Sequence, residues 1–235
     1  MVNILEIGCG QGFNSYVASR KRNNQVTGVD LSKEDIKIAK LRYPEINFKV
    51  MNAEKMSFAK NSFDEVYALD VLEHVDNLNK VIKEVHRILK KNGLFIINVP
   101  HPKSEKWLLS VRPTYFKEIH HVRIFEEKDM DKAVLKEGFK LVKSKNRGFL
   151  QHIELYFLFK RKINSKTQVS IGSWRDNYFT KVLHAILLFT DPLVLYTPLK
   201  YVPIWVITIP LGMIINSIGS LFFPKSQYYE YKKIK

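Results

Sequence analysis

The stretch ILEIGCGQG, residues 4–12, decides the fold of this chain. An apolar run typical of a buried strand ends in three glycines at alternate positions, and residues 13–18, FNSYVA, are typical of a helix start. Glycine reaches backbone angles that other residues avoid, and it has no Cβ atom to hold a ligand away from the main chain. We therefore predict a strand, a ligand-binding turn and a helix in this order.

A carboxylate follows at the distance expected of a nucleotide-binding unit. Asp30 ends the next apolar run, residues 26–29, and lies 20 positions after Gly10. In a βαβ unit this spacing brings an acidic side chain onto a ribose. Residues 1–30 are therefore expected to hold a nucleoside.

Strands and helices alternate through residues 1–100, which predicts an α/β fold with a doubly wound parallel sheet. A capping-box pattern at 32–35 marks the start of the second helix. Apolar residues at three- and four-residue spacing mark the third, and Gly93 is expected to end it. We expect strands at about 2–7, 25–29, 46–50, 65–69 and 94–99, and helices from 13, over 32–43, over 78–89 and over 126–137.

The pattern G-x-G-x-G, with Glu6 ahead of it, is the first of four motifs. The others are NAEKMSFAKNSFD at 52–64, LDVLEHV at 69–75 and RILKKNGL at 87–94. In these motifs and their order the chain resembles class I S-adenosylmethionine-dependent methyltransferases. It is most similar to the type 11-like subgroup that methylates small molecules, lipids and sugars. The resemblance is strong over roughly 2–100 and loose over 120–160.

The resemblance implies a Rossmann-like sheet, mostly parallel and closed by an antiparallel hairpin of residues 139–144 and 151–159. It implies S-adenosyl-L-methionine as the cofactor. No metal is expected, since with a single cysteine no zinc spacing exists. Asp30 would accept hydrogen bonds from both ribose hydroxyls, and Asn52 stands where the family often has aspartate. The residues that the resemblance assigns to cofactor binding are Glu6, Gly8, Gly10, Gly12, Asp30, Leu31, Asn52, Ala53 and Asp70.

Histidines are the candidate catalytic residues. Transfer to an oxygen acceptor needs a base, and the pKa of histidine lies near neutrality. His120 and His121 precede the last predicted helix, and His74 lies in the LDVLEHV motif. We expect the base at His120 or His121, with His74 and then His101 as further candidates.

The formal charge of +15 favours anionic partners, but the basic residues are spread along the chain. No Asn/Asp-Pro-Pro-Tyr segment follows residue 69, so nucleic acid is not the expected partner. Cys9 is the single cysteine, which excludes an intrachain disulfide and indicates a reducing compartment. We expect Cys9 to be a small packing residue rather than a reactive thiol.

Composition changes after residue 162. We predict a methyltransferase domain at 1–162 and a hydrophobic, helical C-terminal appendage at 163–235. Residues 201–223 carry no charge, and these 23 residues are long enough to cross a bilayer. Prolines and glycines interrupt them, so we favour a membrane hairpin or interfacial segment within 182–223. A folded lid or dimer arm is the alternative.

Both ends of such a segment would lie on the cytoplasmic side, where tail lysines such as Lys233 meet an anionic leaflet. Deleting 165–235 is expected to leave a folded domain that binds the cofactor. Because the first residues already form a strand, no signal peptide is expected. We therefore expect a cytoplasmic protein at the inner face of the membrane.

The predicted function is methyl transfer to an amphipathic small molecule, lipid-linked or glycan-linked, at oxygen. Two alternatives remain open at this point. One is a methyltransferase of a small soluble metabolite, with the appendage as lid or dimer interface. The other is a module that binds S-adenosylmethionine without transferring its methyl group.

Overall fold

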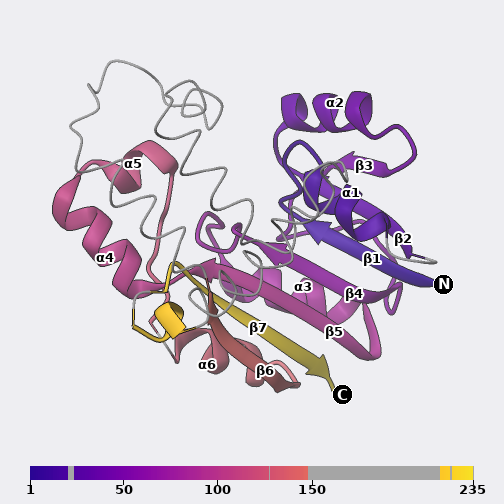
Figure 1. Cartoon of the computed structure of the whole chain (residues 1–235). Helices are drawn as coiled ribbons and strands as arrows, with labels where there is room; N and C mark the ends of the chain where they lie inside the picture. Colours follow the sequence, from indigo (N-terminus) through magenta and orange to yellow (C-terminus); the bar gives the residue numbers. More distant parts are fainter. Residues whose placement is uncertain (21–23, 127, 148–217, 223, 235) are drawn as a thin grey trace, which may run out of the picture. The chain divides into compact units, whose positions relative to one another are not determined.

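A computed structural model describes residues 1–20, 24–126, 128–147, 218–222 and 224–234. Within these ranges, seven strands form one sheet in the order β3-β2-β1-β4-β5-β7-β6 (Figure 1). The strands are β1 (Val2–Ile7), β2 (Asn24–Asp30), β3 (Asn47–Val50), β4 (Phe63–Leu69), β5 (Leu89–Pro100), β6 (Phe139–Arg147) and β7 (Ser226–Lys233). The helices are α1 (Phe13–Ser19), α2 (Lys33–Arg42), α3 (Leu78–Ile88), α4 (Pro102–Val111), α5 (Tyr115–Ile119) and α6 (Asp129–Leu135).

The first five strands are parallel. β1 pairs with β2 and β4, β2 pairs with β3, and β4 pairs with β5. β7 runs opposite to β1, as the arrows in Figure 1 show. This arrangement confirms the predicted doubly wound sheet, which is mostly parallel and has an antiparallel end. It also brings the carboxyl ends of β1, β2 and β4 to one edge, where ligands bind in such sheets.

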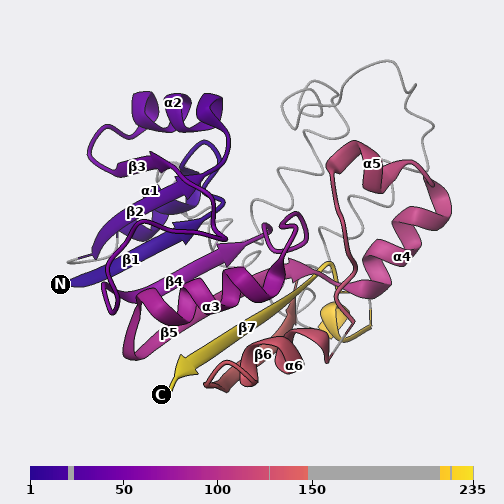
Figure 2. The ribbon, with the colours of Figure 1, turned by 180° about the vertical axis from the view of Figure 1, so that it is seen from behind.

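Alternate residues of β1 feed two separate cores. Ile4 packs in one cluster with residues of α1 and α2, and Leu5 packs in the other with residues of α3 and α6. This is the period of a strand, whose successive side chains point to opposite faces. In Figure 2, α3 lies in front of the strands. Helices therefore cover both faces, which leaves the sheet edge as the place for a site.

Two local predictions can be compared with the structure. The Ser32 hydroxyl accepts a hydrogen bond of 3.1 Å from the backbone N–H of Asp35, which confirms the predicted cap of α2. The end of α3 was predicted wrongly, because α3 stops at Ile88 and Gly93 lies inside β5. The pairing of β4 with β5 is irregular between Phe63 and Glu65, and this irregularity accommodates the early strand start.

The strand that lies beside β6 is a correction to the predicted hairpin. That strand is β7, from residues 226–233, and the segment 151–159 that we expected lies outside the described residues. Tyr229 and Tyr231 are 4% and 0% exposed and belong to the main core. The sheet therefore takes a core strand from the region that the sequence assigned to the appendage.

Lys233 is the second correction in this region. Its side chain is buried, and Nζ donates hydrogen bonds of 2.7 Å to the carbonyls of His86 and Leu89 at the end of α3. An ammonium group is favourable at a helix C-terminus, where carbonyls are left without partners. Lys233 thus anchors β7 and is not available to a membrane surface.

The described chain divides into two compact units. One comprises Met1–Pro102, Phe116–Lys145 and Gln227–Lys235, and the other Lys103–Tyr115 and Asn146–Ser226. Most of the predicted apolar segment 182–223 lies outside the described residues. Among the helices that the structure describes, none is long and apolar enough to cross a membrane.

Candidate functional site

Three glycines shape the loop between β1 and α1. Gly8, Gly10 and Gly12 have φ angles of 68°, 49° and 86°, a region that L side chains rarely adopt. A Cβ atom on Gly8 would lie 2.4 Å from Cγ2 of Val71, and one on Gly12 would lie 2.6 Å from Cζ of Phe48. A Cβ atom on Gly10 would meet no atom within 4 Å beyond its chain neighbours. The backbone at Gly10 is therefore open to a ligand.

Asp30 is fixed at the end of β2 by two backbone donors. Its Oδ2 accepts a hydrogen bond of 2.9 Å from the N–H of Gly10, and its Oδ1 accepts one of 2.9 Å from the N–H of Ser32. A carboxylate oxygen has a second lone pair, so both oxygens can still accept from a ligand. The structure thus joins the predicted ribose carboxylate to the predicted glycine loop. Leu31, beside it, is 68% exposed.

Glu6 lies beneath the loop and is 1% exposed. Its Oε2 accepts a hydrogen bond from the hydroxyl of Ser15 in α1, while its buried Oε1 accepts none within the described residues. Burial is the main cause that raises the pKa of Glu6 to about 7, because a charged carboxylate is poorly solvated there. Glu6 therefore ties β1 to α1 and leaves one oxygen for a donor.

Cys9 is a packing residue at the same place. It is 6% exposed, and a Cβ atom on Gly28 would lie 2.9 Å from its sulfur. Burial raises the pKa of the Cys9 thiol, which disfavours the reactive thiolate. This agrees with the packing role expected from the sequence.

Asp70 follows β4 in a left-handed backbone conformation, with φ of 53°. Its N–H donates to the carbonyl of Asn98 at 2.9 Å, and Nδ2 of Asn98 donates to Oδ1 of Asp70 at 2.8 Å. Asn98 therefore holds the exposed Asp70 carboxylate at the sheet edge. Sequence reasoning missed Asn98, although a polar residue near the end of the apolar strand β5 was the available signal.

The adenine-edge candidates follow β3. Asn52 is exposed, and its Oδ1 accepts a hydrogen bond of 2.7 Å from the N–H of Glu54, while Ala53 is buried. The N–H of Met51 donates to the carbonyl of Asp30 at 2.9 Å, which brings this turn to the end of β2. The contact of Asn52 and Ala53 with adenine remains a prediction.

The structure brings two of the three predicted catalytic histidines together. The rings of His74 and His121 lie 4.7 Å apart, edge to face. Nε2 of the half-buried His121 lies 4.0 Å from Oε1 of Glu73, a residue that sequence reasoning did not single out. The side chain of His120 is not part of this group, because His120 is exposed and has φ of 59°. His120 contributes its backbone carbonyl instead.

That carbonyl fixes the protonation of the His74 ring. Nδ1 of His74 lies 3.1 Å from the carbonyl oxygen of His120, and a carbonyl can only accept. Nδ1 therefore carries the hydrogen, and Nε2 has the basic lone pair. Although His74 is exposed as a residue, partial desolvation of its ring is the largest cause that lowers its pKa, which favours the neutral ring at pH 7. A neutral ring with a lone pair on Nε2 is the form that a general base requires.

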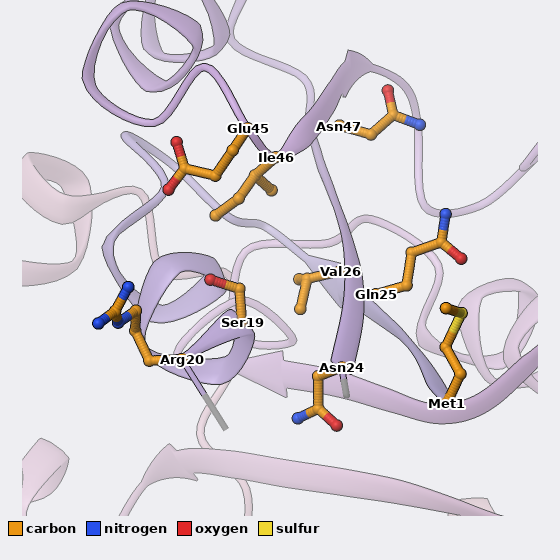
Figure 3. Close-up of a pocket in the computed structure, with 9 residues that line it drawn as sticks. All are labelled: Met1, Ser19, Arg20, Asn24, Gln25, Val26, Glu45, Ile46 and Asn47. Atoms are coloured by element: carbon orange, nitrogen blue, oxygen red, sulfur yellow. The ribbon is translucent and has the colours of Figure 1, made fainter. Parts of the chain in front are cut away.

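A cavity of about 510 Å³ lies elsewhere (Figure 3). Met1, Asn24 and Gln25, at the amino ends of β1 and β2, line it together with Arg20, Glu45 and Asn47. The glycine loop and Asp30 follow the carboxyl ends of the same strands. The cavity is therefore separate from the site that the sequence predicts.

The comparisons with known proteins agree with the fold and the loop. Residues 5–97 match the family described as a methyltransferase domain. This stretch of the chain is therefore similar to methyltransferase domains, and the sequence resemblance implies S-adenosylmethionine as the cofactor. The residues present fit this cofactor, because the backbone is open at Gly10, Asp30 presents two oriented oxygens, and Glu6 has a buried oxygen without a donor.

Curated relatives are similar to part of this chain. The ubiquinone biosynthesis O-methyltransferase of Pelagibacter ubique is 35% identical over 114 residues, which are 47% of this chain and 47% of that protein. The demethylmenaquinone methyltransferase of Chlorobaculum parvum is 34% identical over 116 residues, which are 49% and 48%. The chain thus spans about half the length of these curated relatives.

A solved structure shows the fold. The crystal structure of a SAM-dependent methyltransferase from Methanosarcina mazei has a TM-score of 0.53 and 24% identity. The match covers 62% of this chain and 83% of that one.

Proposed function

We propose that this protein transfers the methyl group of S-adenosylmethionine to an oxygen of an amphipathic acceptor, lipid-linked or glycan-linked, at the inner face of a membrane. The observation that carries the proposal is the fixed tautomer of His74. His74 follows Asp70 by four residues in the loop after β4, at the edge of the sheet where a ligand binds. A base at this edge is needed for an oxygen acceptor and not for a free amine.

The chemistry follows from these residues. Bound S-adenosylmethionine supplies an electrophilic methyl group on a sulfonium. The glycine loop and Asp30 would hold the nucleoside, so that the acceptor oxygen forms its bond to the methyl carbon as the carbon–sulfur bond breaks. His74 would take the hydroxyl proton at Nε2 and become an imidazolium. Alignment of the three reacting atoms is the larger part of the catalysis.

Two observations support an amphipathic acceptor at a membrane. The two relatives described above are named for ubiquinone biosynthesis and for demethylmenaquinone. The apolar sequence 182–223 ends in a described helical turn where Leu221 and Phe222 are 70% and 62% exposed. Exposed apolar residues of this size favour a lipid or protein surface over water.

The positions of the residues on either side of 148–224, the segment between β6 and β7, support a segment that enters the membrane and returns on the same side. The N–H of Lys225 donates to the carbonyl of Arg147 at 2.9 Å, so residues 148–224 leave and rejoin the fold at one place. If this segment binds a membrane, its two ends would lie on the same side, so the segment would enter the bilayer and return or would lie in the interface. The domain would then stay on the inner face.

The test uses S-adenosylmethionine with a tritiated methyl group and a membrane lipid extract. Wild type should label an extractable acceptor through an ether that resists mild alkali. His74→Gln should lower the rate by about 10²–10⁴-fold, the usual contribution of a general base. His120→Ala keeps the backbone carbonyl that His74 contacts and tests the His120 ring, while Lys117→Ala, at an exposed cation of α5, is the control.

Other outcomes separate the alternatives. A full rate for His74→Gln would move the base to His121, and label on nitrogen or carbon would end the oxygen assignment. Label on a water-soluble metabolite alone would favour the soluble methyltransferase. Cofactor binding without any transfer would identify a binding module.

A further inference from the structure

We infer that Arg123 is a positioning residue that holds the loop carrying His74. This inference rests on the proposed function, in which His74 is the base. Arg123 belongs to the segment between α5 and α6, and nothing in the sequence motifs singles it out. Its guanidinium donates hydrogen bonds to the carbonyls of Val75 and Asp76, the second at 2.9 Å. These are the two residues that follow His74.

A second contact ties the same two segments together. The N–H of Val122 donates to the carbonyl of Glu73 at 3.0 Å, on the other side of His74. With the His74 ring bonded to the carbonyl of His120, residues 120–123 contact the chain immediately before, at and after the base. The base is therefore held through its neighbours as well as through its own ring.

Arg123 acts on the loop and not on the helix that follows. The start of α3 has its own support, because Oδ1 of Asn77 accepts from the N–H of Lys80 at 3.1 Å. The N–H of Asn77 in turn donates to Oε1 of Glu54 at 2.7 Å. Loss of Arg123 should therefore loosen residues 73–76 and leave α3 in place.

The chemistry of the guanidinium suits this role. Both hydrogen bonds come from Nη2, whose two hydrogens lie in the fixed plane of the guanidinium and point in different directions. A lysine ammonium also has several hydrogens, but it rotates on a flexible stem and does not hold them in this plane. Arg123→Lys is thus a variant that keeps the positive charge and loses the planar donor geometry of the guanidinium.

The groups around His74 determine how it titrates. Asp70 favours its charged form, while His120 and His121 disfavour it, and burial lowers its pKa most. Glu73, next in sequence, faces His121. His74 is exposed as a residue, and the remaining desolvation of its ring lowers the pKa. If the loop loosens, the ring loses this desolvation, and its pKa should rise toward the ordinary value of about 6.5.

The test measures the tautomer and the titration of the His74 ring in the full-length protein. Nuclear magnetic resonance of protein labelled with ¹³C and ¹⁵N at histidine gives the tautomer and the titration of each ring, and His74→Gln assigns the signals. Wild type should show hydrogen on Nδ1 of His74 at pH 7.5. Arg123→Lys and Arg123→Ala should mix the two tautomers and move the titration upward. Lys117→Ala, an exposed cation of α5, removes one charge as the control.

The outcomes distinguish this inference from the proposed function. An unchanged tautomer and titration in both Arg123 variants would overturn the positioning role. Changed signals, with unchanged calorimetric affinity for S-adenosylmethionine, would establish it even if His74→Gln transferred methyl groups at full rate. In that case the assignment of His74 as the base would be wrong, and the positioning of residues 73–76 by Arg123 would be confirmed. If Arg123→Ala does not fold, Arg123→Lys carries the test.

Discussion

The backbone N–H of Lys225 donates a hydrogen bond of 2.9 Å to the carbonyl of Arg147, and this contact joins the two sides of a long insertion. Arg147 ends β6, and Lys225 precedes β7. The two strands are neighbours in the sheet. Residues 148–224 are therefore an insertion in a hairpin, and the sheet needs both of its ends.

The first prediction is that residues 148–224 can be replaced by Asn-Gly. A two-residue turn can connect Arg147 and Lys225, because the N–H of Lys225 already donates a hydrogen bond to the carbonyl of Arg147, as in a hairpin with a short loop. We expect the shortened chain to unfold cooperatively and to bind S-adenosylmethionine with the affinity of the full chain. Thermal unfolding and calorimetry measure both.

Truncation at residue 164 is the contrasting variant. From the sequence we expected deletion of 165–235 to leave a folded domain, but this deletion removes β7. Tyr229 and Tyr231 would leave the core, and loss of a buried aromatic costs about 3–5 kcal/mol. The truncated chain should be unfolded at 25 °C. A stable truncated domain would show that β7 is dispensable.

The second prediction concerns membranes. The full chain should float with vesicles that contain anionic phospholipid, and the chain with Asn-Gly in place of 148–224 should not. Vesicles of neutral lipid alone are the control for the electrostatic part of the binding free energy. Each basic residue near an anionic surface contributes about 1 kcal/mol to it. A full chain that is monodisperse without detergent and ignores both vesicles would favour the lid or dimer arm.

The third prediction concerns cofactor choice. Asp30→Ala should weaken the binding of S-adenosylmethionine by about 1–3 kcal/mol, because hydrogen-bond donors at the site are left without an acceptor. The N–H groups of Gly10 and Ser32 lose their acceptor in the same variant. Glu34→Ala removes an exposed carboxylate nearby and is the control. Calorimetry with NAD as the second ligand completes the test, and tighter binding of NAD would contradict the assignment.

The sequence predicted the first half of the fold well because its signals are local. The apolar run before Gly8 and the cap at Ser32 each specify an element within a few residues. The same holds for the edge of the sheet, where Gly10 and Asp30 are joined as their spacing suggests. Five of the strands could therefore be placed from residues 1–100 alone.

The rest depends on contacts between distant residues. β7 pairs beside β5 and is separated from β6 by the whole insertion, so no short-range turn signal identifies its partner. Likewise, Arg123 contacts the carbonyl of Val75, 48 positions earlier. A backbone carbonyl leaves no mark in the sequence, so the contact between His74 and the carbonyl of His120 could not be predicted from it.

The last prediction concerns the pH dependence of stability at Glu6. Its pKa is about 7 in the folded chain and 4.5 as the ordinary value, so between these values the folded state binds more protons than the unfolded state. The free energy of unfolding therefore falls as pH rises through this window, by about 3 kcal/mol in all for such a shift. Glu6→Gln cannot lose a proton and should remove this fall.

Urea unfolding at pH 5, 6, 7 and 8 measures the effect in both proteins. Glu6→Asp, which keeps the carboxyl group on a shorter side chain, is the control for titration. Wild type should be less stable at pH 8 than at pH 5 by an amount that Glu6→Gln does not show. Parallel curves for wild type and Glu6→Gln would mean that another group causes the slope. In that case the buried carboxyl beneath the glycine loop would not titrate near neutrality.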